Sequence, residues 1–348
     1  MANQLNKHSV DFRNKRALSI CKKAVDELKL DLSGQTVLTE IGSNFYLYLP
    51  VIALLANAKK VIAWCKDSSY GSASDIISDF KALDLSAKQM NAIVFRANEC
   101  SHLDIEESTI ITNSEALRPL NENFLSKIKN DQTVISLMYE AWEIRREDID
   151  IEYCKQKDLR VAGTNENHPL LRVFEYGGPL ACKMSFEAGY EVFRNNIMVW
   201  SDDEFGQVAT KAFKAMGASS VVSTTNVDAF YEALPALDFI YLCNYHEKRD
   251  YISNKTGSVF NLTQILDKNP NLGIVHLYGT LNSENLLAAG LNVHPAKNGR
   301  AMFMTNTLGY AGLNPIIYLQ AAGLKVAEEM IAGKFSTISQ PISGYSKN

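Results

Sequence analysis

Short apolar segments alternate with amphipathic segments along most of the chain. The apolar segments are rich in β-branched residues and are bounded by polar turn residues, a pattern typical of buried parallel strands. The segments between them repeat apolar residues at three- and four-residue spacing, as one face of a helix requires. The alternation therefore predicts an α/β fold with doubly wound parallel sheets.

The predicted strands fall into two groups. The first group is QTVLTEIG, KKVIAWC, NAIVFR, STIITN, QTVISLM and LRVAGT, and the second is NIMVW, SSVVST, DFIYLCN, GIVHLYG and LNVHP. We expect a first domain over 1–168, a helical connector over 169–190 that is interrupted at Gly177, Gly178 and Pro179, and a second domain over 191–305. A chain of 348 residues is long enough for about two domains.

Charge and cysteine content narrow the classes of partner. The net charge is −4 and no basic run occurs, which argues against nucleic acid as a partner. The longest apolar run, YLYLPVIALLANA, contains a proline and is too short to cross a membrane. The 6 cysteines lack metal-binding spacing, so we expect free buried thiols, no metal and a cytoplasmic location. The start of the chain lacks the apolar segment of a signal peptide.

The segment NIMVWSDDEFGQVATKAFKAMGASSVVST has the order of a dinucleotide-binding unit: strand, turn, helix, strand. Such turns carry G-x-G-x-x-G, whose glycines let backbone N–H groups approach a pyrophosphate. Here the turn runs from Ser201 to Gly206 and keeps only the last glycine. We expect Asp202 or Asp203 to cap the helix by accepting a backbone hydrogen bond, and to repel a pyrophosphate.

Four segments in sequence order resemble the D-isomer-specific 2-hydroxyacid dehydrogenases. They are STIITNSEALRPLNENFLSKI, ISLMYEAWEIRREDIDIEYCKQKDLRVAGTNENHP, NIMVWSDDEFGQVATKAFKAMGA and NPNLGIVHLYGTLNSENLLAAG. The resemblance implies two Rossmann-like doubly wound domains, a flavodoxin-like substrate domain and a nucleotide-binding domain, with an interdomain cleft. It also implies that 306–348 form a helix returning to the first domain, followed by a polar tail that we expect to be loosely ordered.

The sequence differs from that family at the family's catalytic positions. The position of the family's arginine falls near Tyr278 and Gly279, and its Pro-His position reads MFMTNTLGY, with Asn306 and Thr307. None of these residues is a guanidinium or a general base at neutral pH. The resemblance therefore implies a divergent relative. If it binds NAD or NADP, the implied cofactor-binding residues are Ser201, Gly206, Thr224, Gly279 and Asn306.

Polar residues that follow the strands of the first domain are the candidate substrate site. Arginines suit a carboxylate, and a large aromatic among convergent polar groups is typical of pockets. The alternative is a charge-balanced surface in which acidic and basic residues pair at helical spacing. We take Glu166 as the first candidate for general acid or base and His246 as the second; the candidate substrate-binding residues are Asn113, Arg118, Glu140, Trp142, Arg145 and Asn165.

These observations lead to two functional hypotheses. The first is an NAD(P)-dependent oxidoreductase-like protein acting on a small polar, carboxylate-bearing metabolite in the cleft. The second is a non-redox binding or scaffold protein that has lost dinucleotide binding. A third, less supported hypothesis rests on Gly42, Ser43 and Asp67, which resemble the first motif of S-adenosylmethionine methyltransferases. A homodimer is expected because two-fold dimers are the commonest assembly.

Overall fold

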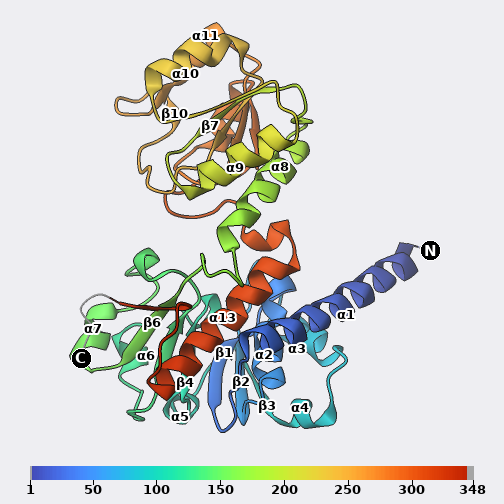
Figure 1. Ribbon diagram of the computed structural model, residues 1–348, viewed down its shortest axis with the longest axis vertical. Coiled ribbons are helices and arrows are strands. Elements are labelled where there is room, and N and C mark those ends of the chain that lie inside the picture. The colour runs from blue at the N-terminus through green and yellow to red at the C-terminus, as the bar shows by residue number, and fades with distance from the viewer. Residues whose placement is uncertain (1, 343–348) are drawn as a thin grey trace. The chain divides into compact units, whose positions relative to one another are not determined.

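The computed structural model describes residues 2–342, which form two compact units. Unit 1 takes in Met1–Arg172 and Leu313–Asn348, as far as these are described, and unit 2 is Val173–Gly312. Each unit has its own sheet, parallel in all but one strand pairing, with helices against it (Figure 1). The predicted α/β class is confirmed.

The sheet of unit 1 has the strand order β14-β6-β5-β4-β1-β2-β3. Neighbouring strands are parallel except at β14, which is antiparallel to β6. Strands β1 to β3 proceed outward in one direction and β4 to β6 in the other, so the order reverses between β1 and β4. The strands are β1 (Thr36–Glu40), β2 (Lys60–Cys65), β3 (Ile93–Ala97), β4 (Ile110–Asn113), β5 (Val134–Leu137), β6 (Arg160–Thr164) and β14 (Ser339–Pro341).

Helix α13 (Leu313–Ala332) is the longest buried helix of unit 1, and it packs on β5 and β6 beside α1 and α2 (Figure 1). Gly323 permits this approach, because a Cβ there would collide with the Met138 sulfur. The other helices are α1 (Ala2–Leu28), α2 (Leu49–Leu55), α3 (Ala73–Lys81), α4 (Ala87–Asn91), α5 (His102–Glu106), α6 (Glu122–Leu125) and α7 (Ile151–Gln156), with the 3-10 turns η1 (Asn44–Leu47), η2 (Glu115–Leu117) and η3 (Ala141–Glu143).

The segment after Lys334 corrects our expectation of a loosely ordered tail. Residues Ser339–Pro341 form β14, which pairs with β6 along the edge of the sheet. Ile338 and Ile342 flank the strand and are buried, so apolar burial holds a segment that is mostly polar. The remainder of the predicted tail, 343–348, lies outside the described residues.

The expected break at Gly177, Gly178 and Pro179 is also wrong. These residues begin a continuous helix, α8 (Gly177–Glu187), directly after the 3-10 turn η4 (Val173–Tyr176). The first N–H groups of a helix have no acceptor within it, so a proline at the third position removes no hydrogen bond. A Cβ on Gly178 would lie 3.0 Å from the carbonyl oxygen of Val208, so glycine allows α8 to pack closely on α9.

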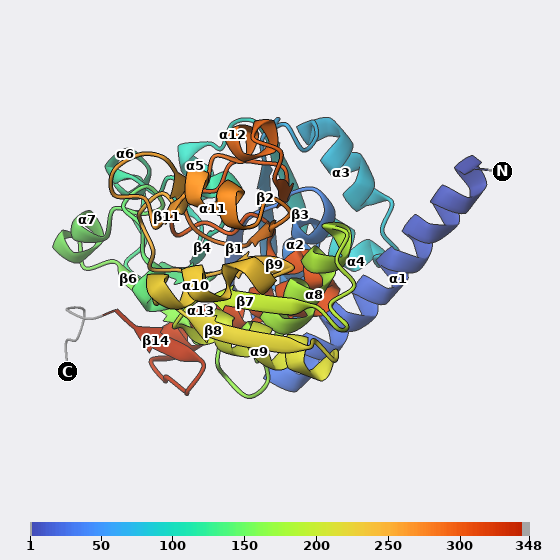
Figure 2. The same cartoon turned by 90° about the horizontal axis from the view of Figure 1, so that it is seen from above.

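Unit 2 has a parallel five-stranded sheet in the order β13-β12-β9-β7-β8, which reverses between β7 and β9. Figure 2 shows β7 and β8 side by side with α9 next to them. The strands are β7 (Asn196–Trp200), β8 (Ser220–Thr224), β9 (Phe239–Leu242), β12 (Gly273–His276) and β13 (Asn292–His294), with a small pair β10 (Ile252–Ser253) and β11 (Phe260–Asn261). The helices are α8, α9 (Glu204–Ala215), α10 (Val227–Ala233), α11 (Leu262–Lys268) and α12 (Ser283–Ala288), with 3-10 turns η4, η5 (Leu234–Ala236) and η6 (Leu308–Ala311).

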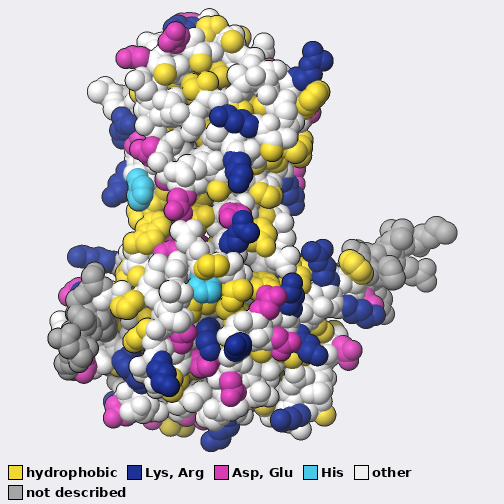
Figure 3. Space-filling model, viewed as in Figure 1, with side chains coloured by type: hydrophobic (Ala, Val, Ile, Leu, Met, Phe, Trp, Pro, Cys, Tyr) yellow, Lys and Arg dark blue, Asp and Glu magenta, His cyan; other side chains and the backbone are white. Residues whose placement is uncertain are grey.

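Charges of both signs are interspersed on the face drawn in Figure 3. Among residues 2–342, no helix is both long and apolar enough to cross a membrane.

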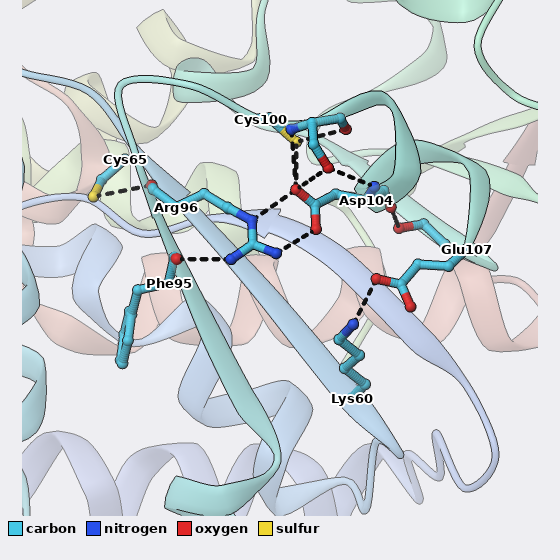
Figure 4. A network of polar contacts seen from close by, with 9 residues as sticks. Lys60, Cys65, Phe95, Arg96, Cys100, Asp104 and Glu107 are labelled. Atoms are coloured by element: carbon cyan, nitrogen blue, oxygen red, sulfur yellow. Dashed lines mark hydrogen bonds and ion pairs between the residues drawn. The ribbon is translucent and has the colours of Figure 1, made fainter.

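An ion pair between the partly exposed Arg96 and the buried Asp104 joins the end of β3 to α5 in unit 1 (Figure 4). The Nε and Nη2 atoms of Arg96 donate to the two carboxylate oxygens of Asp104 at 2.7 and 2.8 Å. Ser101 adds hydrogen bonds from its backbone N–H and its hydroxyl. Burial acts to raise the pKa of Asp104, but the hydrogen bonds from Arg96 and Ser101 outweigh it, and the pKa lies below its usual value.

We expect Asp104→Asn to lower the free energy of unfolding at neutral pH by about 2–3 kcal/mol, because the Arg96 charge loses its partner. Because the folded-state pKa of Asp104 is depressed, this contribution is present above the unfolded pKa and is lost as pH falls through the folded pKa. Urea unfolding at several pH values measures both. The control is Lys60→Met, which breaks the more exposed pair with Glu107 and should cost less than about 1 kcal/mol. Equal losses in the two variants would contradict the assignment.

Candidate functional site

Three glutamates gather at the carboxyl ends of β5 and β6. Glu140 is 3% exposed. One of its carboxylate oxygens accepts the backbone N–H of Glu166 at 2.8 Å, and the other accepts the Trp142 indole N–H at 3.1 Å and the Gln340 amide. The Glu140 side chain is thus held by three donors, and one donor comes from β14.

The neighbouring glutamates have raised pKa values. Burial raises the pKa of Glu166 well above its usual value, and the charges of Glu143 and Glu140 add to the effect. Burial also raises the pKa of Glu143 to about 7, with Arg145 acting against it and Glu140 acting with it. Carboxyl groups whose environments separate their pKa values can hold and exchange protons near neutral pH. The cluster has this property.

Two arginines lie beside the glutamates. Nη1 of Arg118 and Nε of Arg145 are 3.7 and 3.5 Å from the same oxygen of Asp148. Their guanidinium carbons lie 5.2 and 5.7 Å from the centre of the Tyr139 ring. Arg118 also donates to the side-chain and backbone oxygens of Asn113 at 3.1 and 2.9 Å. The arginines are therefore held in place by the ends of β4 and β5 and by the loop after β5.

A cavity lies at the position where the strand order of unit 1 reverses. Its volume is about 130 Å³, and its polar lining comes from Glu40, Ser114, Arg118 and Gln320. Glu40 ends β1, Ser114 follows β4, and Gln320 lies on α13. Open α/β sheets bind ligands at such reversals, outside the carboxyl ends of the strands. Arg118 is common to the cavity and to the group around Asp148.

The structure places the predicted substrate residues in two linked groups. Glu140, Trp142 and Glu166 form one group, joined by hydrogen bonds. In the other group, Arg118 donates to Asn113, and both Arg118 and Arg145 lie beside Asp148. Trp142 is 50% exposed.

Two other candidates lie elsewhere. The Asn165 amide donates to the carbonyl oxygen of Thr337, so it faces the segment before β14. His246 is an exposed residue of unit 2, and its backbone N–H donates to Asn244.

Sequence reasoning missed Glu40, Gln320 and Gln340. The only local signal for Gln320 is a glutamine on the apolar face of a long helix, IIYLQAAGL. Glu40 ends a buried strand, as other candidates do, and could have been included on that ground. Gln340 had no signal, because its role depends on the pairing of β14 with β6.

In unit 2, the turn between β7 and α9 is filled by its own aspartate. One carboxylate oxygen of Asp203 accepts the backbone N–H groups of Phe205 and Gly206 at 3.0 and 3.2 Å, and the other accepts that of Tyr245 at 2.8 Å. Asp202 accepts the Asn244 amide at 2.9 Å. The predicted helix cap is confirmed, and the donors that a phosphate would need are used within the protein.

The remaining candidate cofactor-binding residues are accounted for by contacts within unit 2. A Cβ on Gly206 would lie 2.5 Å from that of Ser201, so the turn itself requires glycine there. Gly279 has a φ of 99°, and a Cβ there would collide with the Tyr251 ring. The Thr224 hydroxyl accepts the N–H of Asn226 at 3.0 Å, and Asn306 is half-buried before η6. These residues do not form the usual cradle for a pyrophosphate.

No family model matches the sequence, and a search of the curated proteins finds no match. Among solved structures, the chain is similar to a dipicolinate synthase component from Bacillus halodurans, with 12% identity over 87% of this chain and 98% of that one and a TM-score of 0.51. It is similar to the corresponding dipicolinate synthase chain from Bacillus subtilis, with 12% identity, coverage of 88% and 99%, and a TM-score of 0.52. A D-isomer specific 2-hydroxyacid dehydrogenase from Lactobacillus delbrueckii ssp. bulgaricus has 10% identity, coverage of 87% and 99%, and a TM-score of 0.44.

The two dipicolinate synthase chains show that the fold is a known one, shared over nearly their whole length. At these identities the likeness concerns the fold, and a fold does not by itself carry a function. Function has to be argued from the residues. Within residues 2–342, no group of three or more His, Cys, Asp or Glu is arranged to hold a metal.

The pKa of Glu143 predicts a pH-dependent stability. Because the folded-state pKa is raised from 4.5 to about 7, the free energy of unfolding should fall as pH rises between these values. Glu143→Gln should remove a part of this fall on the order of 2–3 kcal/mol. Chemical denaturation from pH 4.5 to 8 measures it, with Glu99→Gln, an exposed glutamate of unit 1, as the control. A Glu143→Gln profile that parallels the unmodified protein would show that Glu143 titrates normally.

Proposed function

We propose that the chain is a protein of dehydrogenase-like fold that binds a small polar, carboxylate-bearing metabolite in unit 1 and does not hold NAD or NADP at the β7–α9 turn. One observation supports the absence of NAD or NADP from this turn: three backbone N–H groups already donate to the Asp203 carboxylate. The proposal therefore favours the non-redox hypothesis over hydride transfer.

The free-energy cost of binding a pyrophosphate at this turn supports the same conclusion. A pyrophosphate on this turn would have to displace the helix cap, whose loss costs about 0.5–2 kcal/mol. It would also face the carboxylates of Asp202 and Asp203, and one like-charge pair about 4 Å apart near a protein surface costs roughly 4 kcal/mol. Each 1.4 kcal/mol corresponds to about tenfold in affinity. Binding in the usual mode is thus weakened by several orders of magnitude.

Unit 1 has the groups that a carboxylate-bearing metabolite needs. Arg118 has five N–H donors, of which Asn113 takes two, so others remain for a ligand carboxylate. Any proton transfer to or from the ligand is assigned to the Glu166 and Glu143 carboxyl groups, whose pKa values are raised, with the Glu140 side chain hydrogen-bonded beside them. In this scheme Trp142 and Arg145 border the site rather than react, and Asn165, which faces the segment before β14, lies outside it.

An NAD(P)-dependent oxidation or reduction is the second candidate. It is supported by fold analogy alone, through the likeness to the two dipicolinate synthase chains. Thr224, Gly279 and Asn306 would have to hold the cofactor without the usual pyrophosphate turn, and Glu166 or His246 would manage the proton. Because the turn does not fit a pyrophosphate, no hydride step follows from this geometry.

Two substitutions of Asp203 separate the two effects that oppose pyrophosphate binding, namely the helix cap and the negative charge. Asp203→Asn keeps a capping side chain and removes the charge, whereas Asp203→Gly removes both. We expect no NAD or NADP binding at submillimolar concentration by the unmodified protein, a gain in Asp203→Asn and a larger gain in Asp203→Gly. The glycine variant should also lose roughly a few tenths of a kcal/mol of stability, because glycine is tolerated at the helix cap better than most residues.

Isothermal titration calorimetry measures the affinity, and fluorescence of Trp200, at the end of β7, reports occupancy in a variant with the other two tryptophans replaced. Asp228→Asn, an exposed aspartate at the start of α10, is the control for lost charge. Micromolar NAD binding by the unmodified protein, with the pyrophosphate seated on this turn in a crystal structure of the complex, would overturn the proposal for this turn.

A further inference from the structure

We infer that the cavity at the strand reversal of unit 1 binds a small aliphatic α-amino acid as its zwitterion. The inference rests on the proposed function, which places a carboxylate-bearing ligand in this unit, and it specifies the chemical class of that ligand. Three properties of the cavity wall carry it: a buried amide without partners among residues 2–342, a pair of opposite charges, and a mostly aliphatic remainder.

Gln320 supplies the first property. Its side chain is on α13, is 4% exposed, and lines the cavity. Neither its amide nitrogen nor its amide oxygen has a hydrogen-bond partner within the described part of the chain. Buried polar groups without partners are rare because they lose their hydrogen bonds to water without replacement. An amide that is open at both ends suits a ligand that carries an acceptor and a donor on adjacent atoms.

The charges of the wall define those two ligand groups. Arg118 contributes a guanidinium, and Glu40, which ends β1, contributes a carboxylate. A ligand carboxylate would pair with Arg118 and an ammonium group with Glu40. A plain carboxylate would leave Glu40 facing a like charge, and a plain amine would do the same to Arg118. The zwitterion satisfies both, and the Gln320 amide can donate to its carboxylate and accept from its ammonium.

Glu40 is held in a defined position. One of its carboxylate oxygens accepts the backbone N–H of Ala116 at 2.9 Å, and its own backbone N–H donates to the Ser114 hydroxyl at 3.3 Å. That hydroxyl is 2.9 Å from the Thr112 hydroxyl, which is 2.8 Å from the Thr39 hydroxyl. These bonds connect β1 to β4 across the strand reversal, so the charged wall is pre-organised for a ligand.

The rest of the lining sets the ligand's size and side chain. Leu49, Met138, Ile316 and Leu319 contribute aliphatic and thioether surface, and Tyr46 contributes an aromatic ring. The volume of about 130 Å³ compares with roughly 10–15 Å³ for a single water on the same measure. A branched aliphatic side chain of a few carbons matches the size of this cavity and its mostly aliphatic lining.

Three matched ligands test the class with the full-length protein. Valine, used as each enantiomer, carries both charges; 2-hydroxy-3-methylbutanoate lacks the ammonium group; isobutylamine lacks the carboxylate. We expect one valine enantiomer to bind in calorimetry and to raise the melting temperature. The hydroxy acid should bind at least tenfold more weakly, and the amine should not bind at millimolar concentration.

Variants assign the binding to this cavity. Gln320→Leu should weaken valine binding at least tenfold while leaving the melting temperature of the ligand-free protein equal or higher, because an unpartnered buried amide is removed. This second readout excludes misfolding as the cause. Gln207→Leu, at an exposed glutamine of unit 2, should change neither. Glu40→Gln should reduce the preference for valine over the hydroxy acid at least fivefold.

Several outcomes would overturn the inference. Valine binding that is unchanged in Gln320→Leu would place the ligand elsewhere. Hydroxy acid binding as tight as valine binding, and lost in Arg118→Met, would refute the zwitterion while leaving a carboxylate metabolite in unit 1. If no carboxylate ligand binds at all, the inference and the unit 1 part of the proposed function both fail.

Discussion

A polar group buried in either unit must find a hydrogen-bond partner or lose on the order of 1–3 kcal/mol, and the two units meet this requirement in opposite ways. In unit 2, Asp203 supplies the acceptor for the N–H groups at the start of α9, so these donors are not open to a phosphate. In unit 1, the Gln320 amide has no partner among the residues that the structure describes. One site is thus closed by its own chain and the other is open to a ligand.

The glutamate cluster depends on the same requirement over a long sequence distance. The Glu140 carboxylate is held in place because the Glu166 N–H, the Trp142 indole and the Gln340 amide all donate to it. Burial raises the pKa values of Glu143 and Glu166, and the nearby Glu140 carboxylate adds to the effect. Strand β14 therefore does more than extend the sheet, because it brings one of the three donors that fix this charge.

Local features were predictable where a local rule governs them. The strands followed from runs of β-branched residues, and the Asp203 cap followed from an aspartate placed immediately before an amphipathic helix. Polar residues after β4, β5 and β6 could be selected because parallel strands end at one edge of a sheet. The break expected at Pro179 is wrong because a proline in the first turn of a helix removes no hydrogen bond, whereas one in the middle does.

The sequence by itself determined the α/β class, the loss of the glycine motif at Ser201–Gly206 and the apolar faces of the long helices, because each depends on residues that are close in the chain. The tertiary structure decided which polar side chains meet. Gln320 reaches the cavity only because α13 packs on the sheet of unit 1, and Gln340 reaches Glu140 only because β14 pairs with β6. A pKa likewise depends on burial and on neighbouring charges, and the local pattern of the sequence predicts neither.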